Sequence, residues 1–294
     1  MKILNFGSLN IDKVYSVKNI VKEGETIDSI NYKENAGGKG LNQSIAISRA
    51  KGIVYHAGLI GRDGEFLKRI LDDNSVDVSL IEYTNTVSGQ AIIQVDEKGK
   101  NCIILYHGAN YEIEENFVDR VLQNFQENDI LLLQNEISNL NYIIQQAKIK
   151  KMKIYLNPSP INKNLMKCNF LLLNGIFINE HEASYLSGKP ITNIKGILDS
   201  LSNTYPKLEI ILTLGDKGAF YRCGNEQIFQ SAYKVKAIDT TAAGDTFTGY
   251  YITLKQQGKS IKKCMEIASK AASIAVTRKG ASISIPMIDE VLKA

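Results

Sequence analysis

The feature that most constrains the fold is an alternation between short apolar runs and longer segments with helical spacing. Six runs are apolar enough to be buried strands: "KILNFG" (2–7), "VYHAGLIG" (54–61), "DILLLQN" (129–135), "KIYLNP" (153–158), "GIFIN" (175–179) and "EIILTLG" (209–215). Most are separated by longer patterns such as "NLNYIIQQAKIKK" and "IKGILDSLSNTY", where apolar residues recur at helical spacing. Because strands that alternate with helices build parallel sheets covered by helices, we expect an α/β fold.

Two segments interrupt this alternation. Residues 13–36 are polar and broken, and residues 88–106 predict a hairpin that turns around Glu97, Lys98 and Gly99. Extended segments inserted into an α/β chain predict a small second sheet; a lid and a decorated edge of the main sheet explain the pattern equally well. The length of 294 residues is compatible with one large α/β domain or two smaller ones, and the sequence has no repeat or proline-rich linker.

Composition argues against several functional classes. The net charge of +4 is spread along the chain without a basic block, so nothing indicates a nucleic-acid surface. The cysteines lie far apart and the three histidines are scattered, which argues against a zinc site or a disulfide framework and is typical of reduced cytosolic thiols. The first residues soon turn polar, unlike a signal peptide, and no apolar run approaches a membrane span. We therefore expect a cytoplasmic protein without nucleic-acid or membrane partners.

Polar side chains follow several of the predicted strands. Asn10 and Asp12 come just after the first strand, Glu136 follows "DILLLQN", and Asn157 follows "KIYL". Taken alone, Asn10 and Asp12 are explained equally well by a turn in which an Asn or Asp side chain bonds the backbone. Ligands of open α/β sheets, however, bind at the carboxyl ends of the strands. The set as a whole therefore predicts a ligand crevice.

A glycine-rich turn precedes a predicted helix in "NAGGKGLNQSIAISRA" (35–50). Its glycines let the backbone approach another group closely, and a turn into a buried helix is the simplest explanation. Lys39 and Asn42 are not needed by such a turn and suit a polyhydroxylated ligand. The motif is not a dinucleotide-binding fingerprint, because Gln43 replaces its last glycine, and this argues against an oxidoreductase.

The segment "DTTAAGDTFTGY" (239–250) combines two carboxylates, small residues and a helix start. The backbone N–H groups of Ala243, Gly244 and Asp245 would be unpaired helix-start donors, which suit a transferring phosphoryl group. Asp245 at the same place could accept a proton from an attacking hydroxyl. Asp239 lies too far back to cap this helix, so a second role such as cation binding would explain it.

Two further segments have both a structural and a functional interpretation. In "INEHEASYLSG" (178–188), Asn179, Glu180 and Glu182 open a helix after a strand, and helix capping is the stronger explanation. The functional interpretation is an outer-shell site for Mg²⁺, which proteins usually hold through water and substrate phosphates. "TLGDKGAF" (213–220) predicts a strand and a glycine turn, which taken alone form a hairpin.

Together these motifs resemble the PfkB (ribokinase) family of carbohydrate kinases. "GSLNID", "GGKGLNQ", "NPSP", "NEHEA", "TLGDKGA", "DTTAAGDTF" and "AVTRKGASISIP" occur in the family's order and span nearly the whole chain. The resemblance implies that residues 1–294 form a single three-layer α/β/α domain with a mostly parallel sheet. It also implies a small β-sheet lid over the sugar, with segments at about 13–36 and 88–106, and a homodimer in which the lids pair.

The resemblance also implies an ATP-dependent kinase that phosphorylates a primary hydroxyl, with D-ribose the expected substrate and Mg²⁺ and K⁺ as metal cofactors. The alternatives within the family are 2-deoxyribose, fructose or a nucleoside. A non-catalytic sugar-binding regulator with the same fold is the rival from another class, against which the intact Asp245 and its glycine bend argue.

Position by position, the resemblance implies four groups of site residues. The catalytic group comprises the base Asp245 and an anion hole at Ala242, Ala243 and Gly244. The sugar contacts are Asn10, Ile11, Asp12, Gly38, Lys39, Gly40, Asn42, Glu136 and Asp245. The nucleotide contacts are Asn179, Thr213, Leu214, Gly215, Asp216, Lys217, Gly218, Gly244 and Ser269. The cation positions are Glu182 for Mg²⁺ and, for K⁺, Asp239, Thr241, Ala275, Arg278, Gly280 and Ser284.

Overall fold

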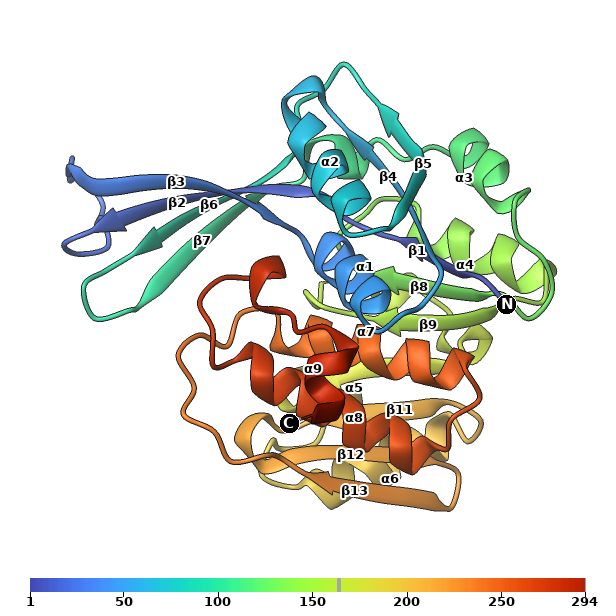
Figure 1. The fold of residues 1–294 in the computed structure, drawn as a ribbon. Helices are drawn as coiled ribbons and strands as arrows, with labels where there is room; N and C mark the ends of the chain where they lie inside the picture. The colour runs from blue at the N-terminus through green and yellow to red at the C-terminus, as the bar shows by residue number, and fades with distance from the viewer. Residues whose placement is uncertain (163–164, 294) are drawn as a thin grey trace.

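This computed structural model describes residues 1–162 and 165–293. Within them, a mostly parallel main sheet has the strand order β13-β12-β11-β10-β9-β8-β1-β4-β5 (Figure 1). Its strands are β1 (Ile3–Phe6), β4 (Val54–Ile60), β5 (Asp77–Tyr83), β8 (Ile130–Gln134), β9 (Lys153–Asn157), β10 (Gly175–Asn179), β11 (Glu209–Thr213), β12 (Gly218–Cys223) and β13 (Glu226–Ser231). The strands run parallel from β5 to β11, while β12 and β13 are antiparallel at one edge.

Helices cover both faces of this sheet. One face carries α1 (Lys39–Arg49), α2 (Glu65–Asp73), α7 (Ala243–Gln256), α8 (Ile261–Ala275) and α9 (Ile288–Lys293). The opposite face carries α3 (Glu115–Leu122), α4 (Leu140–Ile149), α5 (Glu180–Ser187) and α6 (Ile194–Thr204). The predicted three-layer α/β/α arrangement is therefore confirmed. Among the described residues, no helix has the length and apolar character needed to cross a membrane.

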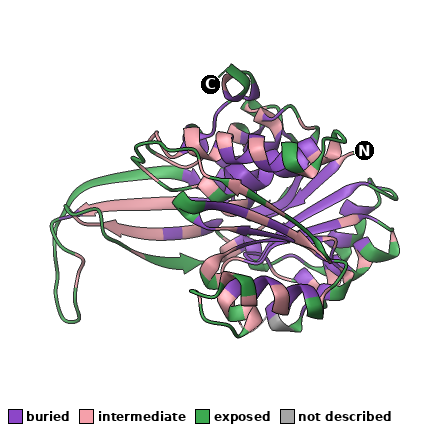
Figure 2. Cartoon of the chain, turned by 90° about the horizontal axis from the view of Figure 1, so that it is seen from below, coloured by how far each residue is buried: buried purple, intermediate pink, exposed green. Residues whose placement is uncertain are grey.

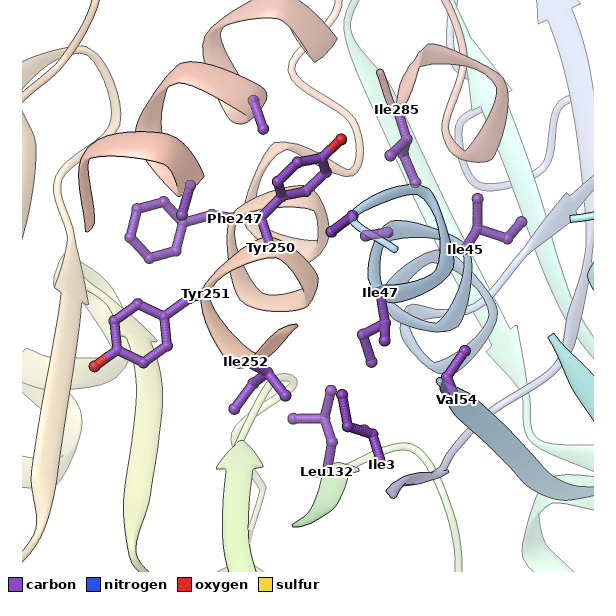
Figure 3. Close-up of a cluster of buried hydrophobic side chains, with 14 of the residues drawn as sticks. Ile3, Ile45, Ile47, Val54, Leu132, Phe247, Tyr250, Tyr251, Ile252 and Ile285 are labelled. Carbon is purple, nitrogen blue, oxygen red and sulfur yellow. The ribbon is translucent and has the colours of Figure 1, made fainter. Parts of the chain in front are cut away.

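The strands contribute side chains to two separate hydrophobic cores, because successive side chains point to opposite faces of a sheet. In β8, Leu131 and Leu133 pack on the side of α3 to α6, whereas Ile130 and Leu132 pack on the side of α1 and α7. Figure 3 shows the second of these cores, where side chains from α1 and α7 meet those of the central strands. Burial on both faces explains why these strands are continuous apolar runs in the sequence.

A second sheet projects from the main body with the order β3-β2-β6-β7 (Figure 1). It is formed by β2 (Asn10–Val17), β3 (Ser29–Gly37), β6 (Gly89–Val95) and β7 (Asn101–Tyr106). The expected hairpin is present, with β6 and β7 paired antiparallel on either side of residues 96–100. Most of this sheet is exposed or half-buried, in contrast to the main sheet (Figure 2). The structure thus has a separate four-stranded lid sheet rather than a decorated edge of the main sheet.

The direction of the chain across the main sheet reverses between β1 and β8. The chain moves from β1 to β4 and β5 on one side, and later from β8 to β11 on the other. Such a switch point leaves a crevice at the carboxyl ends of the two strands. The lid begins at this place, because β2 starts at Asn10 shortly after β1 ends.

Candidate active site

The glycine turn before α1 brings the start of that helix against the end of β1. Gly38 has a φ of 96°, a backbone conformation that favours glycine. A Cβ added to Gly40 would lie 2.3 Å from the backbone nitrogen of Ser8, so only glycine fits there. The Gly40 N–H donates to Ser8 Oγ at 3.2 Å. Packing within the chain therefore accounts for both glycines, and their arrangement places Lys39 and Asn42 beside the crevice.

One ammonium and three carboxylates gather at the crevice. Lys39 Nζ lies 3.3 Å from Glu136 Oε1, and the Lys39 backbone N–H donates to Glu136 Oε2 at 3.0 Å. Burial, with added repulsion from Glu136, raises the pKa of Asp12 to about 7. Burial opposes the charge of Lys39, but Glu136 and Asp245 hold its pKa above the usual value. Lys39 is thus charged, while Asp12 titrates near neutrality.

Asp245 lies in the first turn of α7 and is buried. Asn42 Nδ2 donates to its Oδ2 at 3.1 Å, and Gln43 Nε2 donates to its Oδ1 at 2.8 Å. Burial raises the pKa of Asp245, while Lys39 and the two amides act against that increase. Asn42 Oδ1 is a buried acceptor for which the described residues provide no hydrogen-bond donor. A ligand hydroxyl would supply the missing donor.

Asn10 is oriented by a neighbouring amide. Asn110, in the short 3₁₀ turn Gly108–Tyr111, donates from Nδ2 to Asn10 Oδ1 at 2.7 Å. Asn110 is itself fixed, because its Oδ1 accepts the N–H of Leu9 at 3.0 Å. Since the oxygen of Asn10 is engaged by Asn110, its amide nitrogen is the end left to donate to a ligand.

A cavity of about 510 Å³ lies on the other side of the α7 start. Of the expected nucleotide contacts, six line it: Thr213, Gly215, Asp216, Gly218, Gly244 and Ser269. Asn179, Leu214 and Lys217 are outside the set of described residues that line the cavity. Much of the remaining wall comes from residues 232–237, an irregular segment after β13 that carried no recognisable sequence motif.

The start of α7 is shared by the cavity and the crevice. Its N-cap, Ala242, has a left-handed φ of 58°, and the N–H of Ala243 donates to the oxygen of Thr240 at 3.3 Å. Within the described part of the chain, the N–H groups of Gly244 and Asp245 have no hydrogen-bond acceptor. Two donors are therefore free where the sequence predicted three. Gly244 lines the cavity, while the side chain of Asp245 bonds to Asn42 in the crevice.

Asp239 joins the segment before α7 to the C-terminal loop. Its Oδ1 accepts the Thr241 N–H at 2.9 Å and the Thr241 hydroxyl at 2.6 Å, and its Oδ2 accepts the Gly280 N–H at 2.9 Å. Burial acts to raise the pKa of Asp239, but these hydrogen bonds outweigh it and hold that pKa below its usual value. The structure thus brings together three of the expected cation positions around an ionised carboxylate.

The remaining expected cation positions follow α8 in the C-terminal loop. The oxygen of Ala275 accepts the Arg278 N–H at 3.1 Å, and the Arg278 side chain pairs with Glu290. Ser284 closes a 3₁₀ turn, Ser282–Ser284, which Arg49 of α1 holds by donating to the oxygen of Ser282 at 2.9 Å. A carboxylate and backbone carbonyls are both hard oxygen donors, the kind of ligand that suits a monovalent cation.

Asn179 and Glu182 form the capping box of α5. Asn179 Oδ1 accepts the N–H groups of His181 and Glu182, both at 2.9 Å, and Glu182 Oε2 accepts the Asn179 N–H at 3.0 Å. The capping explanation of this motif is therefore confirmed. Among the described residues, no cluster of three or more acidic, histidine or cysteine side chains could enclose a metal. A single carboxylate still fits Mg²⁺, since this ion keeps several waters and is held largely by phosphates.

Comparison with known proteins identifies the family. The model of the pfkB family carbohydrate kinases matches residues 1–288. The chain belongs to this family. A ribokinase of Haemophilus influenzae is 36% identical over 301 residues, covering 98% of this chain and 96% of that protein. A deoxyribokinase of Salmonella typhi is 28% identical, covering 99% and 97%.

Solved structures of ribokinases have the same fold as this kinase. The structure of Arabidopsis thaliana ribokinase complexed with ribose and ATP has a TM-score of 0.89 and 28% identity, covering 99% of this chain and 97% of that one. A ribokinase from Thermotoga maritima has a TM-score of 0.87 at 31% identity, covering 100% of both chains. The predicted family, fold and phosphotransferase class are confirmed.

Several amides that orient the site of this kinase were not predicted. Asn5 and Gln134 lie inside buried strands, and Asn110 lies in a short turn. The available signal was a polar residue inside an apolar run, as in "KILNFG" and "DILLLQN", because a buried amide requires hydrogen-bond partners. In the sequence, Gln43 stands out only because it replaces the last glycine of a dinucleotide-binding fingerprint.

Proposed function

We propose that this kinase transfers the γ-phosphoryl group of ATP to the primary hydroxyl of D-ribose, giving D-ribose 5-phosphate. The observation that carries the proposal is the α7 start, where Gly244 faces the cavity and Asp245 bonds to Asn42 in the polar crevice. The identity to a ribokinase and the fold shared with a ribokinase complexed with ribose and ATP support this choice of substrates.

In this proposal the crevice holds the sugar through its hydroxyl groups. Asn10 donates from its free amide end, and the buried Oδ1 of Asn42 accepts one hydroxyl. Asp12, Lys39 and Glu136 supply charged partners, with contributions from the backbone at Ile11, Gly38 and Gly40. A site built from such groups rejects analogues that leave a buried partner unpaired.

Asp245 is the proposed general base. Its Oδ2 takes the proton of the primary hydroxyl as that oxygen bonds to the γ-phosphorus and the bond to the β,γ-bridging oxygen breaks, releasing ADP. The free N–H groups of Gly244 and Asp245 point at the transferring group from a helix N-terminus, where negative charge is favoured.

Two cation sites complete the proposal. Glu182 would hold Mg²⁺, which would supply positive charge next to the nucleotide phosphates. Asp239 and Thr241, with the backbone of Ala275, Arg278, Gly280 and Ser284, would hold K⁺. Because Asp239 also fixes the segment that leads into α7, we expect K⁺ to order the free N–H donors.

We propose that residues 1–294 work as one domain and that two copies pair through their lids. The lid carries exposed apolar side chains that a second lid would cover, including Ile30, Ile103 and Ile104. Sedimentation should give a dimer for the parent and a monomer for Ile104→Asp; a monomeric parent would contradict the pairing.

We expect a cytoplasmic enzyme, in keeping with four free cysteines.

The runner-up substrate is 2-deoxyribose, because the relatives of this kinase include a deoxyribokinase at 28% identity. Fructose and nucleosides are the further alternatives within the family. An amide at position 10 favours ribose, because a sugar with one hydroxyl fewer would leave a buried polar group unpaired.

An ADP-release assay over a panel of sugars tests the proposal. We expect turnover with ribose to exceed that with 2-deoxyribose, fructose and nucleosides, and to rise when Na⁺ buffer is replaced by K⁺ buffer. Asp239→Ala should lose the response to K⁺. Preference for another sugar would refute the ribose assignment, and indifference to K⁺ would refute the cation site.

A further inference from the structure

A chain of buried amides leads from Asp245 into the middle of the main sheet. Gln43 donates from Nε2 to Asp245 Oδ1 at 2.8 Å, and its Oε1 accepts Gln134 Nε2 at 2.6 Å. Gln134 Nε2 also donates to Asn5 Oδ1 at 2.9 Å. Asn5 Nδ2 donates in turn to the oxygen of Gly40 at 2.7 Å. Gln43, Gln134 and Asn5 have no exposed surface, so no water competes for these bonds.

The order of donors and acceptors fixes which end of Gln43 faces Asp245. If the Gln43 amide were flipped, its oxygen would face the carboxylate and its nitrogen would face the nitrogen of Gln134. Both contacts would then be repulsive. Asn5 anchors the far end of the chain, because its nitrogen is engaged by a backbone carbonyl that cannot donate. Gln43 is thus held as a donor to Oδ1.

The second oxygen of Asp245 has a different neighbour. Oδ2 is bonded by Asn42 Nδ2 at 3.1 Å, and the same Asn42 carries the buried Oδ1 that lacks a donor among the described residues. Oδ2 therefore lies on the side where a sugar hydroxyl is required, while Oδ1 is turned toward Gln43 and the sheet.

We propose that Gln43 is a positioning residue for phosphoryl transfer, which holds the Asp245 carboxylate with Oδ2 turned toward the sugar hydroxyl. The inference rests on the proposed role of Asp245 as the base. A donor to the ionised carboxylate also favours its charged form against the effect of burial. Because Gln43 bonds, among the described residues, only to the side chains of Asp245 and Gln134, it acts on turnover rather than on sugar affinity.

Two substitutions distinguish the role of Gln43 in positioning Asp245 from its role in packing. Gln43→Glu keeps the length of the side chain and the acceptor for Gln134, but places a carboxyl group against Oδ1. Gln43→Met removes the donor with little change in volume. Ser44→Ala is the matched control, because Ser44 accepts from the same Asn5 and contacts His56 on the side of the chain away from Asp245.

The test measures kcat and KM for ribose against pH, and titrates ¹³C-carboxyl-labelled Asp245 by NMR. We expect kcat to fall roughly 10- to 100-fold in both Gln43 variants, the scale of a hydrogen bond to a charged group, with KM nearly unchanged. The acid limb of kcat and the Asp245 titration should both move to higher pH, by about one unit in Gln43→Glu. Ser44→Ala should lower the Tm and move neither pH profile.

The two proposals fail differently. A parent enzyme that phosphorylates no sugar overturns the proposed function and the role of Gln43 in transfer together. An active parent whose Gln43 variants turn over and titrate as it does overturns the inference about Gln43 alone. Should Gln43→Met fail to fold, the isosteric Gln43→Glu decides the outcome through the same two profiles.

Discussion

The crevice and the cavity, which meet at the start of α7, are lined by different kinds of residue. The crevice side presents charged and amide side chains drawn from the lid, from α1 and from the end of β8, tied to one another by hydrogen bonds. The cavity side is lined largely by small residues such as Ala219, Ala272 and Ser273. Hydrogen-bonding groups discriminate between hydroxyl patterns, whereas a small-residue wall selects by shape.

The difference has a consequence for stability. On the crevice side, burial raises the pKa of both Asp12 and Asp245, which means that the fold works against their charged forms. The cavity side buries no comparable charge among its described lining residues. The buried carboxylates of the crevice therefore reduce the stability of the fold, and the lining of the cavity has no such effect.

The largest effect is expected where the two sides meet. Asp245→Asn keeps the shape of the side chain but removes the base, so turnover should fall roughly 10²- to 10⁴-fold with ribose and ATP binding largely intact. The control is Asp129→Asn, a buried aspartate that bonds the Lys2 N–H far from the site and should leave kcat unchanged. Steady-state kinetics with calorimetric binding would measure both; near-normal turnover of Asp245→Asn would remove it from this role.

The next effect concerns the crevice alone. Because Asn10 presents amide hydrogens, we predict that the parent prefers ribose over 2-deoxyribose by roughly 10- to 100-fold in kcat/KM. Asn10→Met should bring the two values together and leave KM for ATP unchanged. Equal kcat/KM values for the two sugars in the parent would contradict the proposal that the hydrogen-bonding groups of the crevice select the sugar.

A smaller effect is expected from a substitution in the cavity, where KM for ATP should change and KM for ribose should not. Ser269 is buried and lines the cavity, so Ser269→Leu should fill part of the space and raise KM for ATP by about tenfold. KM for ribose at saturating ATP should stay the same, and Ser273→Ala serves as the matched control. If KM for ribose rose as much as KM for ATP, the cavity and the crevice would not act as separate binding sites.

The smallest effect is on stability. Asp12 has an ordinary pKa of 3.8 and a folded pKa of about 7, so the folded protein keeps a proton that the unfolded chain has lost. Stability therefore falls as the pH rises from about 4 to about 7, and the full loss is present above pH 7. Asp12→Asn should raise the Tm at pH 8 by about 5 °C, with the gain shrinking as the pH falls from about 7 to about 4. An equal Tm difference at both pH values would contradict this account.

Most of the fold followed from the apolar runs. Strands such as β8 are buried on both faces, so their composition alone indicates a parallel sheet between helices. A small second sheet was predicted from the two interrupting segments, but the pattern of residues 13–36 left its role open. Weak alternation is characteristic of a sheet that is largely exposed, and such a sheet can equally well extend the edge of another.

The site was predictable where residues form motifs. Asn10, Asp12 and Glu136 follow strands, and Asp245 opens a helix after small residues. The amides around them were not predicted, because Gln134 contacts Gln43 across 91 positions of sequence and Asn110 contacts Asn10 across 100. Single polar residues in buried elements have no local pattern, and only the fold decides which of them meet.

The measurement that tests the account most directly is a crystal structure with ribose and a non-hydrolysable ATP analogue bound together. The account predicts the primary hydroxyl of ribose within about 3 Å of Asp245 Oδ2, and the γ-phosphoryl group at the N–H groups of Gly244 and Asp245. A sugar whose primary hydroxyl points away from Asp245, or a γ-phosphoryl group that lies away from the α7 start, would contradict it.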